Sequence, residues 1–265
     1  MRFTKMHGIG NDYLFVNCFE EVIENPERLA IVMSKPHFGA GADGLVLIEP
    51  ADGADFGMRI FNADGSEARM CGNGIRCVGK YVYDKGYTDK TSLTIETLSG
   101  IRKLELSVKD GVVESATVDM GVVLVEEDLT LNVADREVCC TPVSVGNPHA
   151  VIFVDDAEAA PVASLGPIIE THSTFPGGIN VEFVQVLGER ELRMRVWERG
   201  SGITMACGTG ACASVAAAVH KGFCPAGTPL TVHLDGGDLQ ICVSEDHVVT
   251  MNGPAVSVYE GEVSL

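Results

Sequence analysis

The sequence predicts an α+β protein built from two pseudo-symmetric, duplicated domains, each with antiparallel strands wrapped around a central helix. Two observations support this fold class. Short β-type runs, closely spaced and bounded by turn residues, outnumber the helical patterns. The second half of the chain also repeats the first at an offset of 136 residues, the spacing between Cys71 and Cys207.

The repeat covers strands, turns and helices in the same order. Asn62 falls on Glu198, and Tyr13 falls on His149. The wider matches place 58–61 on 194–197, Gly72 and Gly74 on Gly208 and Gly210, 85–87 on 221–223, and Gly10-Asn11 on Gly146-Asn147. One residue out of register, 41–43 falls on 178–180 and 93–95 on 230–232. Collinear matches of this kind indicate an internal duplication.

In the first half, Asn25-Pro26 predicts a helix that runs to about Lys35, because asparagine suits an N-cap and proline the first helical position. A second helix is expected over 73–85, closed by Gly86. Two short strands within 1–18 precede these helices, and further strands are expected at 45–48, 56–61, 92–97, 102–109 and 112–120. The short spacing of the last three runs favours antiparallel hairpins.

In the second half, a helical stretch between 155 and 171 is interrupted by Pro167, and an alanine-rich helix follows Cys207 to Lys221. Strands are expected at 138–145, 150–154, 180–187, 192–197, 229–234, 238–244, 247–251 and 255–260. The strand pattern breaks at 126–128, so the domain boundary is expected between about 117 and 130. We predict domains over 1-118 and 119-254.

The charge and cysteine content restrict the classes of function. A net charge of −18 argues against nucleic acid or an anionic membrane surface as a partner. The first residues lack the apolar segment of a secretory signal, and no apolar run is long enough to span a membrane. Nine cysteines, an odd number without a regular framework, indicate a cytoplasmic protein with reduced thiols. Their spacing does not fit a zinc site, so no metal is expected.

Two cysteines share one local pattern: Cys71-Gly72-Asn73-Gly74 and Cys207-Gly208-Thr209-Gly210 each open a predicted helix. Backbone N–H groups and the helix dipole at such a position favour a thiolate, so we expect a lowered thiol pKa. Duplicated domains facing each other would bring the two thiols to opposite sides of one bound carbon. A thiolate then removes a proton and a thiol supplies one to the other face, without a cofactor. The other seven cysteines are expected to be small buried side chains.

Several segments resemble the diaminopimelate epimerase family. The segment from Asn62 to Cys77 looks like the first active-site signature of that family. Glu198-Arg199-Gly200, together with 206–212, looks like the second. Segments 7–12, 38–43, 146–149 and 180–181 are similar to its other conserved blocks. The resemblance extends over essentially the whole chain, in order.

This resemblance implies a cofactor-independent epimerase that interconverts LL- and meso-diaminopimelate for lysine and peptidoglycan precursor synthesis. It implies two pseudo-symmetric domains with the active site in the cleft between them, commonly in a homodimer. The last strand, 255-265, is expected to return to the first domain. Diaminopimelate is the small-molecule partner expected on this basis.

The resemblance also assigns roles to single residues. Cys71 and Cys207 are the acid/base thiols, His149 tunes Cys71, and Glu198 tunes Cys207. The reacting carboxylate is held at the two helix starts by Gly72, Asn73, Gly208 and Thr209. The rest of the substrate is bound by Asn11, Asn62, Asn147, Asn180, Glu198 and Arg199, with Arg199 as a forked donor to the distal carboxylate.

Two positions depart from the family pattern. Many members have glutamine at Gly44 and glutamate at Ile203. These differences leave open a two-cysteine racemase of another amino acid, such as histidine or a glutamate-like acid. A binding protein that has lost catalysis is a further alternative, which the presence of both cysteines, His149 and Glu198 disfavours.

Overall fold

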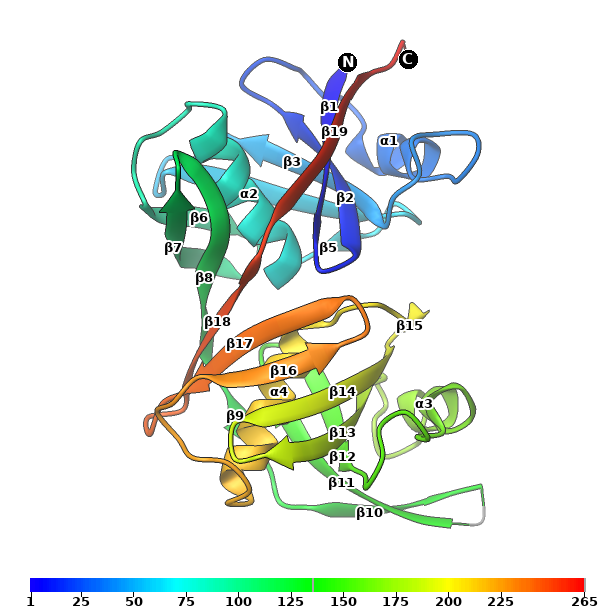
Figure 1. Cartoon of the computed structure of the whole chain (residues 1–265). Helices are drawn as coiled ribbons and strands as arrows, with labels where there is room; N and C mark the ends of the chain where they lie inside the picture. The colour runs from blue at the N-terminus through cyan, green and yellow to red at the C-terminus, as the bar shows by residue number, and fades with distance from the viewer. Residues whose placement is uncertain (135, 265) are drawn as a thin grey trace. The chain divides into compact units, whose positions relative to one another are not determined.

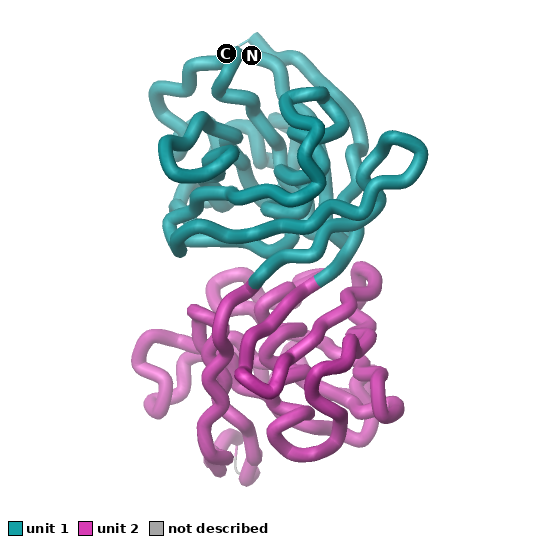
Figure 2. Tube along the Cα trace, turned by 90° about the vertical axis from the view of Figure 1, so that its left-hand side faces the viewer, with its two compact units in different colours: residues 1–119, 252–265 teal, residues 120–251 magenta. Residues whose placement is uncertain are grey.

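The computed structural model describes residues 1–134 and 136–264. The chain forms two compact units, unit 1 from Met1–Asp119 with Asn252–Leu265, and unit 2 from Met120–Met251 (Figure 2). Asp135, inside the predicted second domain, and Leu265, the last residue of the predicted returning strand, lie outside the described residues. The chain passes between the units within strands β8 and β18.

Unit 1 is built from a curved sheet and two helices (Figure 1). Its helices are α1 (Pro26–Met33) and α2 (Gly72–Asp84). Its strands are β1 (Arg2–Gly8), β2 (Asn11–Asn17), β3 (Gly44–Glu49), β4 (Phe56–Asn62), β5 (Glu67–Ala68), β6 (Ser92–Thr97), β7 (Gly100–Lys109), β8 (Val112–Val122) and β19 (Val256–Glu262). These bounds confirm the two helices and all eight strands predicted for this part of the chain to within a few residues, and they add the short β5.

The sheet of unit 1 is mixed. Strand β19 pairs with β1, and the antiparallel pairs continue through β1–β2, β3–β4, β6–β7 and β7–β8. However, β2–β3 and β4–β6 are parallel. The predicted antiparallel strands are thus joined by two parallel pairs, which were not predicted from the sequence. The reason is that α1 follows β2 and α2 follows the short β5, so each helix serves as a crossover between parallel neighbours.

Unit 2 contains the helices α3 (Val162–Glu170) and α4 (Gly208–His220). Its strands are β9 (Leu124–Val125), β10 (Leu129–Val133), β11 (Arg136–Ser144), β12 (Pro148–Phe153), β13 (Asn180–Gly188), β14 (Glu191–Glu198), β15 (Gly202–Ile203), β16 (Leu230–Leu234), β17 (Gly237–Val243) and β18 (Val248–Pro254). Strands β12–β13 and β14–β16 are parallel, whereas β11–β12, β13–β14 and β16–β17 are antiparallel. This is the same series of pairings as in unit 1, as expected for a duplicated α+β fold.

The strand registers show more precisely which residues of the two repeats correspond. Tyr13 pairs with Gly44 on β3, and His149 pairs with Asn180 on β13. Gly44 is therefore the counterpart of Asn180, at the same offset of 136 residues that relates the cysteines. The sequence match of Asp43 with Asn180 was therefore one residue off.

The central helix of each unit lies inside the curve of its sheet, as the labels α2 and α4 show in Figure 1. Helix α2 contacts β1, β2 and β7, and α4 contacts seven strands from β9 to β17. The residues of α4 from Ala211 to Ala218 are all buried, so its apolar alanine-rich run is explained by packing on every side. Each central helix has 13 residues.

The second helix of each unit lies outside the sheet. Helix α1 begins after Asn25, whose side chain accepts a hydrogen bond from the backbone N–H of Arg28 at 2.9 Å, as the predicted N-cap should. Helix α3 continues through Pro167 without a break. Within the described residues, no helix is long and apolar enough to cross a membrane.

Candidate functional site

Cys71 and Cys207 are the N-cap residues of α2 and α4. Both have extended backbone conformations, with φ −137° and ψ 117° at Cys71, and φ −117° and ψ 105° at Cys207. The Sγ atom of Cys71 accepts a hydrogen bond from Gly74 N at 3.4 Å, and that of Cys207 from Gly210 N at 3.3 Å. Each sulfur therefore takes the place of the oxygen that usually caps a helix. The duplicated sequence pattern produces the same local geometry twice.

Asn11 joins several groups around Cys71 in unit 1. Its Oδ1 accepts hydrogen bonds from Cys71 Sγ at 3.4 Å and from Asn73 Nδ2 at 3.2 Å. Its Nδ2 donates to Asp43 Oδ2 at 2.7 Å. The turn before β2 supports this position, because Gly10 has a positive φ of 84°, as its repeat counterpart Gly146 has at 89°. The structure thus brings Asn11, Asn73 and Cys71 together.

Tyr13 lies beside Cys71. Its role was not predicted from the sequence. Its buried hydroxyl forms hydrogen bonds with Cys71 and Asn11. The pKa of this hydroxyl is raised well above its ordinary value, mainly by burial and secondly by the neighbouring Cys71. The hydroxyl therefore stays protonated and can donate to the sulfur. The internal repeat was the one sequence feature that could have drawn attention to Tyr13, because it matches Tyr13 with His149.

Arg76 was also missed, although it belongs to the first signature segment. It lies one turn along α2 from Gly72 and is fully buried. Its guanidinium donates to Gly72 O at 3.1 Å, to Asn73 Oδ1 at 3.0 Å and to Pro254 O at 3.2 Å. These bonds fix the amide of Asn73 with its NH₂ group toward Asn11. Arg76 therefore holds the helix start rather than contributing to a solvated face.

Asn62 closes a tight turn at the end of β4. Its Nδ2 donates to Ser66 Oγ at 3.0 Å, and its backbone N–H donates to Ser66 O at 2.8 Å. Its strand partner is Gly44, where an added Cβ would lie 2.1 Å from the carbonyl oxygen of Phe61. The backbone at this position leaves no room for a glutamine side chain.

Glu198 lies beside Cys207 in unit 2 and forms a hydrogen bond with it. The hydroxyl of Thr204 donates a short hydrogen bond to Glu198 Oε1. Burial raises the pKa of the Glu198 carboxyl. Burial also raises the pKa of Cys207 well above its ordinary value, and the carboxylates of Glu198 and Glu182 raise it further. The expected lowering of the pKa is therefore wrong for Cys207, because burial and two nearby carboxylates outweigh the helix N-terminus.

His149 and Glu182 form a fully buried pair in unit 2, with no exposed side-chain surface. His149 Nδ1 lies 2.7 Å from Glu182 Oε1, and Nε2 lies 3.1 Å from Asn147 Oδ1. Within unit 2, the ring thus contacts these two side chains, and the predicted pairing of His149 with Cys71 stays a prediction. Glu182 was also missed in the sequence analysis, and it stands in β13 between the buried apolar residues Val181 and Phe183.

Asn180 and Arg199 lie on neighbouring strand ends of unit 2. Asn180 donates to Pro148 O at 2.9 Å and accepts from Arg199 N at 3.0 Å. The guanidinium of Arg199 donates to Gly177 O at 2.9 Å. A cavity of about 430 Å³ lies here, within the size range of small-molecule sites. His149 and Arg199 are among its lining residues.

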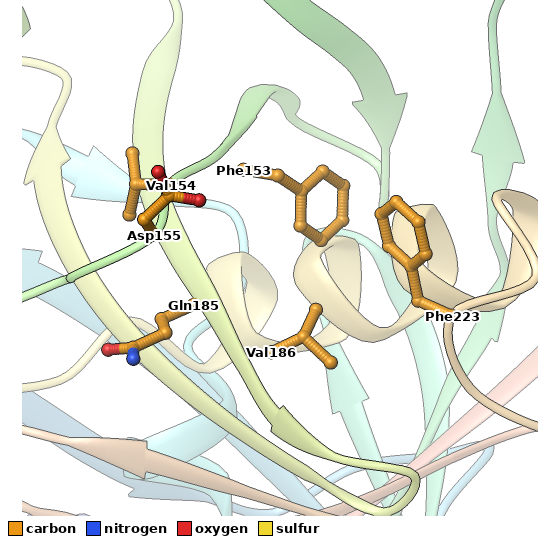
Figure 3. Close-up of a pocket in the computed structure, with 6 residues that line it drawn as sticks. All are labelled: Phe153, Val154, Asp155, Gln185, Val186 and Phe223. Carbon is orange, nitrogen blue, oxygen red and sulfur yellow. The ribbon is translucent and has the colours of Figure 1, made fainter.

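A second cavity, of about 400 Å³, lies in unit 2 on a different set of side chains (Figure 3). Two aromatic rings contribute to its apolar part, Phe153 and Phe223, whose centroids are 5.1 Å apart in an edge-to-face arrangement. Val154, Asp155, Gln185 and Val186 complete the lining. None of the residues predicted for the site is among these six. Within residues 1–134 and 136–264, no three His, Cys, Asp or Glu side chains are grouped as a metal site.

Comparison with known proteins extends over the whole chain. The sequence model of the diaminopimelate epimerase family matches residues 3–125 and 141–258. The diaminopimelate epimerase of Acetivibrio thermocellus is 52% identical over 280 residues, which cover 100% of this chain and 99% of that protein. That of Parabacteroides distasonis is 54% identical over 267 residues, covering 100% and 98%. That of Methanococcus maripaludis is 50% identical over 279 residues, covering 100% of both chains.

Solved structures share the fold at lower sequence identity. A probable proline racemase from Agrobacterium radiobacter superposes with a TM-score of 0.81 at 18% identity, covering 100% of this chain and 93% of that one. A phenazine biosynthesis protein of the PhzF family from Bacillus anthracis gives a TM-score of 0.80 at 18% identity, covering 100% and 99%. These likenesses establish the α+β fold with its duplicated units. The match to the family model and the full-length relatives at 50–54% identity show that the chain belongs to the diaminopimelate epimerase family, a family of isomerases.

Proposed function

We propose that this protein interconverts LL- and meso-diaminopimelate by inverting one α-carbon without a cofactor. The observation that carries the proposal is the pair of helix-capping cysteines, Cys71 and Cys207, set by the same backbone geometry at the same position of two repeats. The 50–54% identity to diaminopimelate epimerases over the full chain supports the choice of substrate. The steps of lysine and peptidoglycan precursor synthesis are then the proposed context.

In the proposed mechanism, one sulfur is a thiolate and the other a thiol, placed on opposite faces of the same substrate carbon. The thiolate takes the α-proton, so that the C–H bond breaks and an S–H bond forms. The thiol then gives its proton to the opposite face of the carbanion. The raised pKa of Cys207 supports this residue as the thiol of the resting protein.

Helix N-termini are suited to the negative charge of this reaction. The backbone N–H groups at Gly72 and Asn73, and at Gly208 and Thr209, are proposed to hold the reacting carboxylate and to stabilise the carbanion as charge develops on it. The exposed guanidinium of Arg199 is proposed to bind the distal carboxylate as a forked donor. The side chains of Asn11, Asn62, Asn147, Asn180 and Glu198 are proposed to bind the remaining polar groups.

The larger organisation remains part of the proposal. Units 1 and 2 are proposed to be the two epimerase-like domains, 1-118 with 255-265, and 119-254. The odd number of cysteines supports a reducing, cytoplasmic setting. The homodimer implied by the family resemblance stays a prediction, which light scattering of the purified protein tests.

The decisive test of the reaction is solvent exchange. Purified, reduced protein is incubated in D₂O with LL-diaminopimelate and no added cofactor, and deuterium at the α-carbons is followed by NMR. Deuterium entering one α-carbon together with formation of the meso isomer is expected. Absence of exchange with diaminopimelate, together with turnover of histidine or glutamate in the same assay, would contradict the proposed substrate.

A further inference from the structure

A continuous series of hydrogen bonds in unit 2 leads from a buried carboxylate to the sulfur of Cys207. Glu182 Oε1 lies 2.7 Å from His149 Nδ1, and His149 Nε2 lies 3.1 Å from Asn147 Oδ1. Asn147 Nδ2 donates to Thr209 Oγ1 at 3.2 Å, and Thr209 Oγ1 lies 3.6 Å from Cys207 Sγ. All five residues belong to unit 2.

The chemistry of each group fixes where the protons lie. The Oδ1 atom of Asn147 can only accept, so His149 Nε2 carries a hydrogen. The oxygen of Thr209 accepts from Asn147, which leaves its own hydroxyl proton to be donated to the sulfur. The proton order of the whole series therefore depends on the orientation of the imidazole ring.

Glu182 sets that orientation. One proton lies in the bond of 2.7 Å between Nδ1 and Oε1, whether the pair is an imidazolium with a carboxylate or an imidazole with a carboxylic acid. Both forms have zero net charge, which makes complete burial of the pair tolerable. Among the described residues, Oε2 of Glu182 has no hydrogen-bond partner, so the carboxyl group is held here by its contact with His149.

Unit 1 holds its cysteine by a different arrangement. The repeat counterpart of His149 is Tyr13, whose hydroxyl contacts Cys71 directly. The counterpart of Glu182 is Val46, a buried apolar residue on β3. A buried carboxylate is costly in a position that the fold can fill with valine. A carboxylate is present at this position in unit 2 and not in unit 1. This difference indicates a role specific to the helix start at Cys207.

We propose that Glu182 is a positioning residue for Cys207. By holding His149 with its Nε2–H toward Asn147, it aligns Asn147 and Thr209 so that the threonine hydroxyl donates to the sulfur. This inference rests on the proposed role of Cys207 as a proton-transfer thiol. No hydrogen bond joins Glu182 to the sulfur among the described residues, so Glu182 positions the sulfur through the three residues between them.

The first test examines the histidine in the protein without substrate. Long-range ¹H–¹⁵N NMR of the uniformly labelled chain, with the His149 signals assigned by comparison with His149→Gln, reports which ring nitrogen is protonated. A protonated Nε2 is expected in the wild type and in Glu182→Gln, whose amide can donate to Nδ1. A wild-type ring with an unprotonated Nε2 would overturn the proposal.

The second test measures the connection to the sulfur. The rate of Cys207 carbamidomethylation by iodoacetamide is followed by peptide mass spectrometry in Glu182→Met, Thr209→Val and the double variant, with Glu182→Gln as the conservative control. Glu182→Met is expected to change the rate by about threefold or more when Thr209 is present, and by much less when Thr209 is replaced. The Glu182→Gln protein should stay close to the wild type.

Equal effects of Glu182→Met in both backgrounds would overturn the proposal, because a purely structural role of Glu182 does not require the threonine hydroxyl. Neither measurement needs turnover of diaminopimelate. A protein that shows the expected proton order but no α-carbon exchange contradicts the proposed function alone. An active epimerase with an unprotonated Nε2 contradicts the role of Glu182 alone.

Discussion

Replacing Gly210 and Gly74 by alanine tests how closely the two helix starts are packed. These glycines are repeat counterparts, and each donates its backbone N–H to the cysteine three residues earlier. An added Cβ at Gly210 would lie 2.7 Å from Glu182 Oε1 and 3.2 Å from Cys207 Sγ. At Gly74 the nearest atoms are the Cβ of Cys71 at 3.6 Å and the Cδ1 of Ile60 at 3.7 Å, which are ordinary contacts.

The size of the effect follows from the difference between the two sites. Both substitutions gain the same helix propensity, about 1 kcal/mol for alanine over glycine, so this gain cancels in the comparison. Overpacking of a core position costs about 1–3 kcal/mol. We therefore expect Gly210→Ala to be less stable than Gly74→Ala by about 1–3 kcal/mol, which corresponds to roughly 2–4 °C in Tm for each kcal/mol.

Differential scanning calorimetry of the two variants and the wild type measures this difference. In parallel, iodoacetamide labelling of Cys207 should change in Gly210→Ala, because the new methyl group displaces Glu182 or the sulfur. The opposite result is that the two variants unfold at the same temperature and that Cys207 is labelled at the wild-type rate in both. That result would mean that Glu182 does not lie against the first turn of α4.

Three further substitutions test other parts of the account. Gly44→Ala should lower the free energy of unfolding by about 1–3 kcal/mol or more, because its Cβ would meet the Phe61 carbonyl oxygen at 2.1 Å; an unchanged Tm would contradict this. Asn11→Ala removes the side chain that joins Cys71 to Asn73 and should lower kcat/KM for diaminopimelate about tenfold or more; a value of kcat/KM within twofold of the wild type would contradict this role. Burial raises the pKa of Glu198, so its contribution to stability is present below its ordinary pKa of about 4.3 and is lost as pH rises through the folded-state pKa. Glu198→Gln should therefore raise Tm at pH 8 and lose this advantage near pH 4, whereas a constant difference between the two pH values would count against the burial of this charge.

The secondary structure and the repeat could be predicted because they depend on local patterns. Asn25-Pro26 and Cys71-Gly72 mark helix starts through capping and backbone freedom, and the strands follow from short apolar runs. The parallel pairing of β2 with β3 could not be read in this way, because it depends on where α1 returns the chain. The correspondence of Gly44 with Asn180 was missed for a similar reason, because it follows from the registers of the parallel pairs β2–β3 and β12–β13.

The site was predictable at its cysteines and less so around them. The residue patterns at Cys71 and Cys207 carry strong local signals, and the structure gives both the expected N-cap geometry. The pKa of Cys207 was not predictable, because it depends on burial and on Glu198 and Glu182, which lie on neighbouring strands. Glu182 has no local signal at all, since a buried acid is recognised only by the partner that it contacts in space.

The turnover of the two single-cysteine variants tests whether both thiols act on the same carbon. Cys71→Ala and Cys207→Ala are compared with the wild type for conversion of LL- to meso-diaminopimelate, with Cys139→Ala, an exposed cysteine, as the matched control. Each of the first two variants should lose about 10²-fold or more in kcat while the control stays active, because removal of either acid/base group stops proton transfer on one face. Retention of near wild-type turnover by Cys71→Ala or Cys207→Ala would contradict the account.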